Sequence, residues 1–419
     1  MSLLFLNMGN KTLLKNNIAL VTECMPHSHN TAIGFMFQTG SRYERECERG
    51  ISHFCEHMLF KGTDTRKRRE IVCAFDKIGG LVNAFTERDD VFMYSVFPSG
   101  SDNLSLVLEI LCDMTLNCNF PADEIEKERT VIQNEIDAVE DDMEESSIDC
   151  LADFIWHDQP LAQNITGSTA DVDSITREQL LDWYQRYFKN GPLTVFVSGN
   201  FNLEQIRSRL EKIPERKSFN FEFNTDFYPG FRYKKSRFNQ VQLYYMHPIK
   251  MPINERQYHS LLVLNAIFGD SMTSRLFERL REERGLCYSV YSFFSSYEDA
   301  AVWGAGVSCD SKRVRQVLEC LKKEFDFLKT LDFTDEELSL SKEHLCGEEV
   351  MGSDDVEYVM KKLQRHYLLS LPLLDTEETL GAIRSIEKND IITFVEENIK
   401  DTRPAILVYG KKNAGNFTL

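Results

Sequence analysis

The sequence has few of the features that mark membrane, secreted or low-complexity proteins. No apolar run comes close to the roughly 18 residues that a membrane-spanning helix needs. Glycine and proline number only 21 and 11, too few for a collagen-like or disordered chain. The first residues, MSLLFLNMGNKTLLKN, include an apolar patch but no preceding basic stretch and no cleavage site, so we predict no signal peptide. We therefore expect a cytoplasmic protein with no membrane partner.

The cysteines lack any pattern that would point to disulfides or to a cysteine-bound metal. There are 11 of them, an odd number, and no C-x-x-C pair occurs. Scattered free thiols suit a reducing compartment. This agrees with an intracellular location.

Basic residues are in deficit. The chain has 48 lysines and arginines against 66 aspartates and glutamates, a net charge of −18. Such a charge repels nucleic-acid phosphates and anionic lipids, so we expect neither as a partner. A cationic polypeptide would be attracted instead.

Four pairs of segments recur at a nearly constant spacing, which predicts an internal duplication. The similarity is weak residue by residue, but the order is the same, and insertions of only a few residues bring all four pairs into line. The pairs are 107–111 with 317–321, 197–200 with 408–411, Asp89 with Asp299, and 120–125 with 333–338. Two domains of about 200 residues suit a chain of 419 residues.

The first half begins with strand-like runs at 10–25 and 31–41, continues with helical patterns at 52–60 and 68–80, and returns to strands at 81–97. Long helices follow, and a strand at 192–200 closes the half. This order predicts an α+β fold of two homologous halves, each an antiparallel-rich sheet covered on one face by helices. We expect an N-terminal half at 1–217, a linker at 218–236 and a C-terminal half at 237–419.

The most informative motif is H-x-x-E-H, formed by His53, Glu56 and His57. Positions i and i+4 share one face of a helix, so both imidazoles can reach one zinc ion. Glu56 lies beside them and can act as a base toward a water molecule. The alternative is an ordinary helix with two partly exposed histidines, but its apolar neighbours, including Phe54 and Met58, indicate a packed helix.

A third metal ligand is expected on the helix predicted over 121–145. Glu128 and Glu135 stand seven residues apart, each three residues after an isoleucine of the apolar stripe. Both therefore border the buried face, where an unpaired carboxylate is costly. One could bind the metal and the other could support a ligand through a hydrogen bond.

The segment HFCEHMLFKGT, followed by ERTVIQNE at 128–135, resembles the inverzincin peptidases, the family of pitrilysin and the mitochondrial processing peptidase. The resemblance extends along essentially the whole chain. It implies one zinc ion per chain held by His53, His57 and Glu135, with Glu128 supporting these ligands and Glu56 as the base. It also implies a clam-shell chamber that encloses the substrate.

Two further segments resemble the same family. Asn83, Ala84, Phe85 and Thr86 match an edge strand that pairs with an extended peptide, although an interior strand is the alternative. Arg281 and Tyr288 match an arginine–tyrosine element that contacts substrate or the scissile carbonyl. Arg284 and Tyr291 have the same spacing but lack the Gly-Leu-x-Tyr context. The second half carries no metal motif of its own.

We therefore predict a zinc endopeptidase that cleaves peptides or unfolded segments, with basic side chains as candidates next to the cut. The alternatives are a non-catalytic scaffold like the respiratory-complex core proteins, or one subunit of a heterodimeric processing peptidase. Because both the metal motif and the Arg281–Tyr288 element are on one chain, a homodimer is the simplest assembly.

Overall fold

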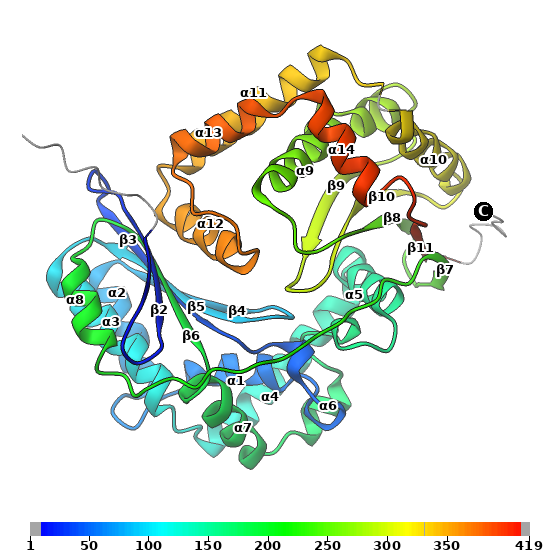
Figure 1. Ribbon diagram of the computed structural model, residues 1–419. Coiled ribbons are helices and arrows are strands. Elements are labelled where there is room, and N and C mark those ends of the chain that lie inside the picture. The colour runs from blue at the N-terminus through cyan, green and yellow to red at the C-terminus, as the bar shows by residue number, and fades with distance from the viewer. Residues whose placement is uncertain (1–9, 331, 412–419) are drawn as a thin grey trace, which may run out of the picture. The chain divides into compact units, whose positions relative to one another are not determined.

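The computed structural model describes residues 10–330 and 332–411 (Figure 1). They form two compact units. Among the described residues, the first comprises 10–138, 163–222 and 352–375, and the second comprises 139–162, 223–330, 332–351 and 376–411. Each unit contains one mixed sheet and its own helices, so the predicted α+β class is confirmed.

The first unit is built around a six-stranded sheet with the order β1-β2-β6-β3-β5-β4. Its strands are β1 (Asn10–Leu13), β2 (Ala19–Cys24), β3 (Asn30–Phe37), β4 (Leu81–Thr86), β5 (Val91–Pro98) and β6 (Leu193–Gly199). Its helices are α1 (Ile51–Leu59), α2 (Arg68–Ile78), α3 (Ser101–Asn117), α4 (Ala122–Asp141), α6 (Thr169–Ser174), α7 (Arg177–Trp183), α8 (Leu203–Leu210) and α12 (Val356–Leu368), with short helical segments η1 (Ser41–Tyr43), η2 (Glu46–Glu48) and η4 (Tyr184–Lys189).

Helices cover both faces of this sheet, which corrects the prediction of one covered face. All but the first residue of β3 are buried, as expected for a strand covered on both sides. Ala32 and Met36 face one way and pack in a cluster with Met360 of α12. Phe37 faces the other way and contacts Phe188 of η4, with ring centroids 4.8 Å apart. The residues around β3 are apolar throughout. This pattern does not predict that α12, which comes from the far end of the chain, packs on the strand.

The second unit has a five-stranded sheet with the order β7-β11-β8-β10-β9. Its strands are β7 (Gly230–Lys235), β8 (Gln240–Ile249), β9 (Ser289–Ser296), β10 (Ala301–Asp310) and β11 (Ala405–Gly410). Its helical elements are α5 (Met143–Trp156), η3 (Pro160–Ala162), α9 (Glu255–Phe268), η5 (Phe277–Glu282), α10 (Val314–Thr330), α11 (Asp335–Gly352), α13 (Thr376–Ser385) and α14 (Lys388–Asn398).

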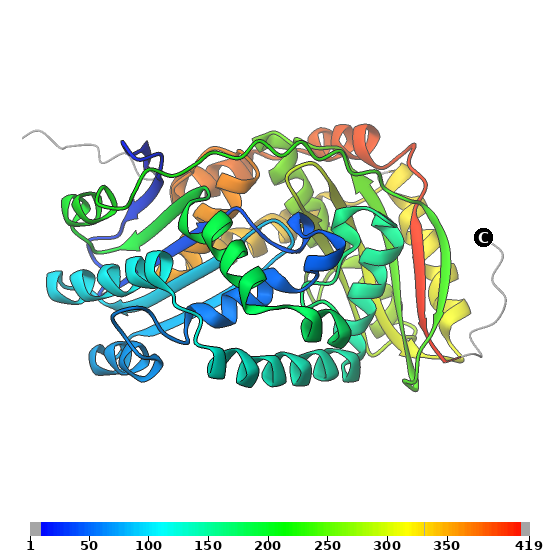
Figure 2. The same cartoon turned by 90° about the horizontal axis from the view of Figure 1, so that it is seen from below.

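The two sheets share one topology, as an internal duplication requires. In each, the last strand pairs parallel to one neighbour and antiparallel to the other: β6 with β2 and β3, and β11 with β7 and β8. Figure 2 shows the red strand β11 running between the green strands β7 and β8. β3 and β8 each pair antiparallel on their other side, with β5 and β10.

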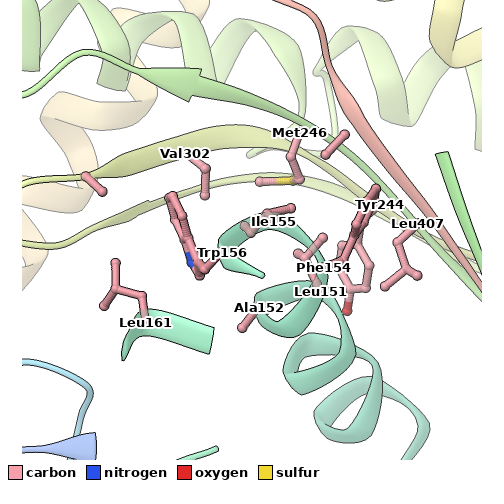
Figure 3. Packing of buried hydrophobic residues seen from close by; sticks show 12 residues of the cluster. Leu151, Ala152, Phe154, Ile155, Trp156, Leu161, Tyr244, Met246, Val302 and Leu407 are labelled. Atoms are coloured by element: carbon pink, nitrogen blue, oxygen red, sulfur yellow. The ribbon is translucent and has the colours of Figure 1, made fainter. Parts of the chain in front are cut away.

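Helix α5 packs against the sheet of the second unit although it lies early in the chain. Ile155 and Trp156 belong to one buried cluster with Met246 and Val302 of the strands above them (Figure 3). The opposite face of β8 carries Tyr245, whose ring stacks on Phe325 of α10 at 4.2 Å. Both faces of this sheet are therefore covered as well.

A single division of the chain at the linker would place α5 in the first unit and α12 in the second. Each of these two helices instead packs in the other unit. The predicted boundaries at 217 and 237 remain a prediction for the domains, but the packing assigns residues 139–162 to the second unit and 352–375 to the first. Part of the expected linker is also ordered as a strand. Phe231 and Tyr233 alternate along β7, which pairs in parallel with β11.

No helix within the described residues combines the length and apolar composition that crossing a membrane would require.

Candidate metal centre

Helix α1, which carries the H-x-x-E-H motif, begins at a position where the backbone requires glycine. Gly50 has a φ of +82°, and a side chain there would meet the carbonyl oxygen of Thr166 at 2.5 Å. The buried Glu44 carboxylate accepts hydrogen bonds from the N–H groups of Gly50 and Ser52, at 2.8 and 2.9 Å. Burial raises the pKa of Glu44 to about 8, against the effect of these bonds. These contacts fix the start of the helix.

His53 and His57 lie one turn apart on α1, and Glu135 of α4 faces both. The two Nε2 atoms are 3.3 Å apart. Oε2 of Glu135 is 3.7 Å from Nε2 of His53 and 3.4 Å from Nε2 of His57. Within the part of the chain that the structure describes, this is the one group of three or more histidine, cysteine or acidic side chains close enough to share a metal ion.

These separations suit zinc. Tetrahedral zinc with bonds of about 2.0–2.1 Å to nitrogen and oxygen holds its ligands about 3.3–3.4 Å apart. The observed distances of 3.3, 3.4 and 3.7 Å are close to that value. Three lone pairs aimed at one region are an unfavourable grouping unless a cation or protons lie between them. The residues predicted as ligands therefore fit Zn²⁺ in both chemistry and spacing.

Glu128, also on α4, connects His57 to Lys61. Its Oε2 lies 3.1 Å from Nδ1 of His57, and its Oε1 is paired with Nζ of Lys61. A carboxylate at this place favours the imidazole tautomer with its proton on Nδ1, which leaves Nε2 available for a metal. Burial opposes protonation of His57, but its bonds with Glu135 and Glu128 raise its pKa. Burial lowers the pKa of His53 to about 4.

Glu56 lies beside the two histidines and is held by a hydroxyl group. Oγ1 of Thr86 donates a hydrogen bond to Oε2 of Glu56 over 2.8 Å, and both residues are only 8% exposed. Burial raises the pKa of Glu56, while the nearby His57 and the Thr86 bond oppose the shift. Its position and its environment suit a general base.

The predicted ligands line a cavity of about 540 Å³ together with strand β4. Among the described strands, β4 pairs only with β5 and forms an edge of the sheet, so the alternative of an interior strand does not hold. Its lining residues are Val82, Asn83, Ala84, Phe85 and Thr86. The outer backbone edge of β4 therefore runs beside the cluster.

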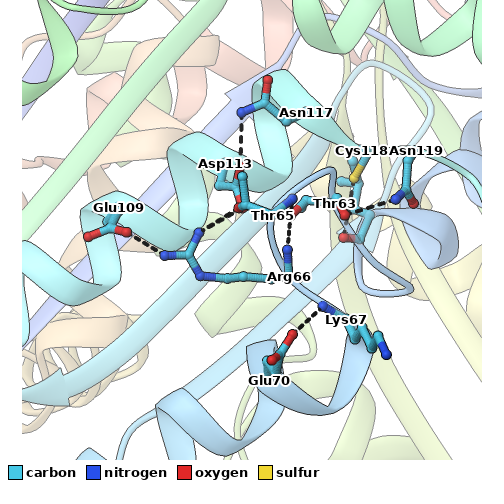
Figure 4. Close-up of polar contacts among 11 residues, drawn as sticks. Thr63, Thr65, Arg66, Lys67, Glu70, Glu109, Asp113, Asn117, Cys118 and Asn119 are labelled. Atoms are coloured by element: carbon cyan, nitrogen blue, oxygen red, sulfur yellow. Dashed lines mark hydrogen bonds and ion pairs between the residues drawn. The ribbon is translucent and has the colours of Figure 1, made fainter.

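The loop that follows α1 is fixed by a polar network around Asp113 of α3 (Figure 4). The Asp113 carboxylate accepts hydrogen bonds from the hydroxyls of Thr63 and Thr65, at 2.6 and 2.7 Å, and from Arg66 at 2.8 Å. Burial alone would raise the pKa of Asp113, but these bonds and one from Asn117 lower it below its usual value. The network anchors the C-terminal side of the helix that carries the histidines.

Arg281 and Tyr288 belong to the second unit. The guanidinium of Arg281 lies over the ring of Phe277 at 4.7 Å, and Tyr288, just before β9, is 76% exposed. The competing Tyr291 is engaged elsewhere, because its hydroxyl donates to Glu144 over 2.7 Å. The expected action of Arg281 and Tyr288 at the metal site stays a prediction.

Two contacts of the site were not predicted from the sequence. Lys61 follows His57 by four residues, a spacing that could have indicated a shared side of the helix. The contact of Thr86 with Glu56 has no such local signal, because the two residues come from a strand and a helix 30 positions apart. Cys55, which lies between the two histidines in the sequence, is buried, and its Sγ is 3.5 Å from the Leu180 carbonyl oxygen.

Comparison with known families identifies the class of protein to which the chain belongs. The fold and the cluster together are those of a candidate zinc peptidase. The family described as "Insulinase (Peptidase family M16)" matches residues 19–169, and "Peptidase M16 inactive domain" matches 174–345. The second match agrees with the absence of a metal motif from the second half of the sequence.

Curated relatives are similar over most of their length. A protein of Rickettsia felis, named an uncharacterized zinc protease, is 31% identical over 383 residues, covering 90% of this chain and 92% of its own. The uncharacterized zinc protease YmxG of Bacillus subtilis is 31% identical over 360 residues, covering 85% and 87%. The chain belongs to peptidase family M16, as the resemblance implied. These names support a protease-like function and the use of zinc.

Solved structures agree in fold. A peptidase M16 inactive domain from Pseudomonas fluorescens has a TM-score of 0.89 at 15% identity, covering 98% of this chain and all of its own. A protease from Helicobacter pylori has a TM-score of 0.84 at 17% identity, covering 96% and 99%. A chain of Complex III2 from Candida albicans reaches 0.78, also at 17% identity, with 96% and 95% covered.

Proposed function

We propose that this protein is a zinc-dependent endopeptidase that cleaves peptides or extended, unfolded polypeptide segments. The observation that carries the proposal is the meeting of three features in one cavity: the His53–His57–Glu135 triangle, the hydrogen-bonded Glu56 carboxylate and the edge of β4. A binding site for a structural metal needs the first feature but neither of the others.

In the proposed mechanism, His53, His57 and Glu135 hold the metal and Glu128 orients His57. Zinc would act as a Lewis acid on the scissile carbonyl and lower the pKa of a bound water. Glu56 accepts a proton from the attacking water and passes it to the leaving amine, while the Thr86 hydroxyl keeps the carboxylate in position.

Peptide recognition is proposed to use the main chain at the edge of β4. Asn83, Ala84 and Phe85 offer backbone groups to an extended substrate, and such pairing is largely independent of the substrate's side chains. Glu56, Glu128 and Glu135 also line the cavity, against the single cation Lys61. A bound Zn²⁺ would bring the sum of these charges to about zero, so the preference proposed for basic side chains next to the cut rests on the family resemblance and on the net charge of −18.

We further propose that Arg281 and Tyr288 assist as the family resemblance implies, and that a homodimer encloses the substrate in a chamber. The alternatives are a scaffold without activity, or a subunit that needs a different partner chain. A chain of Complex III2 shares the fold, but likeness at 17% identity extends no further than the fold.

The deciding experiment measures bound zinc and peptide cleavage on the purified single chain, using a labelled peptide library. We expect about one zinc per chain, cleavage that a chelator abolishes, and restoration by added zinc. Glu56→Gln should keep its zinc and lose at least a hundredfold in rate, because only the base is removed. Zinc without cleavage in the wild-type chain would favour the scaffold, and cleavage only after adding another protein would favour the heterodimer.

A further inference from the structure

A second cavity, of about 450 Å³, lies in the second unit and has a different character. The loop between Arg281 and Tyr288 contributes Arg284 and Leu286 to its lining. The rest of the lining comes from one face of α10 and the residue before it: Arg313, Gln316, Glu319, Cys320 and Lys323. The spacing of three or four residues places these side chains along one side of the helix.

Three acidic residues near this cavity are each paired with an arginine outside its lining. Glu319 is 3.1 Å from Arg315, Glu283 is 2.6 Å from Arg279, and Glu324 is 3.3 Å from Arg275. Among the described residues, by contrast, no ion pair involves Arg284, Arg313 or Lys323. The lining contains three cationic side chains and one carboxylate, that of Glu319. It therefore has an excess of two positive charges.

This excess is unusual for the chain as a whole, whose net charge is −18. Arg284, Arg313 and Lys323 are exposed, so solvent screens part of their mutual repulsion, and a bound anion relieves the rest. The guanidinium of Arg313 reaches the loop between Arg281 and Tyr288, because its Nη1 would be 3.9 Å from a Cβ at Gly285. Guanidinium groups are well suited to carboxylates, which they can bind through two parallel hydrogen bonds.

We propose that this cavity, called here the basic pocket, binds carboxylates of acidic side chains in a peptide substrate. The substrate class rests on the proposed peptidase function; the binding of an anion does not. The pocket is built partly by the loop that connects Arg281 to Tyr288, so an occupied pocket would restrain a segment of peptide near that element. Acidic residues away from the cut would then complement the basic residues expected next to it.

The test measures binding of an acetylated, amidated tetrapeptide of D-glutamate to the full-length, zinc-loaded protein by calorimetry, since D-residues resist cleavage. The matching tetrapeptide of D-glutamine and inorganic phosphate are the comparison ligands. We expect one D-glutamate peptide per chain, weaker binding as salt is added, and no binding of the D-glutamine peptide. Arg284→Gln and Arg313→Gln should each weaken binding about tenfold, as expected for losing one charge-assisted hydrogen bond.

Lys322→Gln is the control, because it removes one positive charge from α10, which carries much of the lining, at a residue outside the lining. Unchanged binding in this control supports the pocket. If Lys322→Gln and Arg313→Gln weakened binding of the D-glutamate peptide equally, the effect would come from the overall charge of the protein rather than from the pocket. That result would overturn the proposal. Absence of binding, or binding of phosphate without binding of the D-glutamate peptide, would also overturn it.

A cleavage assay then tests the substrate class separately. For a peptide with acidic residues distant from the cut, Arg313→Gln should raise KM about tenfold with kcat unchanged, whereas a neutral peptide should be unaffected. If the protein proves to have no peptidase activity, the binding result still decides whether the pocket takes an anion.

Discussion

At the scale of single residues, the two glutamates of α4 have separate surroundings and should have separate roles. Glu135 is 44% exposed in its side chain and faces both histidine Nε2 atoms, whereas Glu128 is buried between His57 and Lys61. Glu135 can therefore bind the metal as an anionic ligand. Glu128 acts indirectly, through the imidazole of His57 that it orients.

Glu135→Gln should therefore empty the metal site, while Glu128→Gln should weaken zinc affinity by about 10–100-fold and leave a measurable fraction bound. Competition with a chelator of known affinity gives both values. Glu140→Gln on the exposed side of α4 is the control and should leave affinity unchanged. An empty site in Glu128→Gln with zinc retained in Glu135→Gln would mean that the two roles are reversed.

The hydroxyl of Thr86 donates the hydrogen bond that holds the Glu56 carboxylate, at 2.8 Å. Thr86→Val keeps the side-chain volume but removes this bond, so kcat should fall about tenfold to a hundredfold while bound zinc stays constant, given a typical 1.5–3 kcal/mol for a hydrogen bond to a charged group. Thr86→Ser should restore most of the rate. Full activity in the valine variant would show that the bond does not position the base.

At the scale of secondary-structure elements, the network around Asp113 should stabilise the loop after α1. Asp113→Asn leaves Arg66 facing an amide, and we expect unfolding to become easier by roughly 1–3 kcal/mol. Glu109→Gln is the control, since Glu109 pairs with the same arginine but is 53% exposed, and exposed pairs contribute about 0–1 kcal/mol. Denaturant unfolding measures both variants.

The difference between wild type and Asp113→Asn should also depend on pH. The pKa of Asp113 is lowered from its usual 3.8 in the folded state, so the stabilisation is complete above about pH 4 and is lost as pH falls through the folded-state pKa. The two unfolding curves should therefore converge in acid. A difference that stays constant from pH 6 to pH 3 would contradict the assigned role of the carboxylate.

The sequence was sufficient for those parts of the site that depend on spacing within one helix. His53 and His57 at i and i+4, and Glu128 and Glu135 beside a stripe of isoleucines, could be assigned to shared faces from periodicity alone. The residues that contact β3 and Glu56 could not be predicted from periodicity, because they come from distant segments of the chain. The helix α12 covers a sheet whose strands all belong to the first half of the chain, and no local pattern specifies that choice.

The strand β7 illustrates the same limit in a single element. Its sequence GFRYKK has only two apolar side chains in alternation, and its residues are half-buried or exposed. What orders it is parallel pairing with β11, the last strand of the chain, rather than a buried face of its own. A search for helical periodicity therefore finds nothing there, and the segment resembles a linker.

At the scale of the whole molecule, duplication explains why one chain carries two sheets of the same topology but one metal motif. The element of the second unit that corresponds to α1 is α9, and its residues Val263, Leu264, Ala266 and Ile267 are buried apolar side chains. The second copy has thus kept the packing of the fold without the metal chemistry. Its distinctive polar groups are instead Arg281, Tyr288 and the basic pocket.

The assembly of the molecule can be tested through this division of functional groups. The metal motif and the Arg281–Tyr288 element are both present on one chain, so a different partner is not needed and a symmetric homodimer is the simplest expectation. Sedimentation at micromolar concentration should give twice the chain mass of 48.6 kDa. A fully active monomer would contradict the dimer.

Mixing two inactive variants then decides which chain completes each site. Glu56→Gln and Tyr288→Phe should each lose activity alone, and exchanged subunits give mixed dimers. If Tyr288 acts across the dimer, one site of each mixed dimer contains both defects and the other contains neither, so about half of one dimer's activity returns. If it acts within its own chain, each site keeps one defect and no activity returns. We expect the second result, with subunit exchange verified by mass-labelled chains.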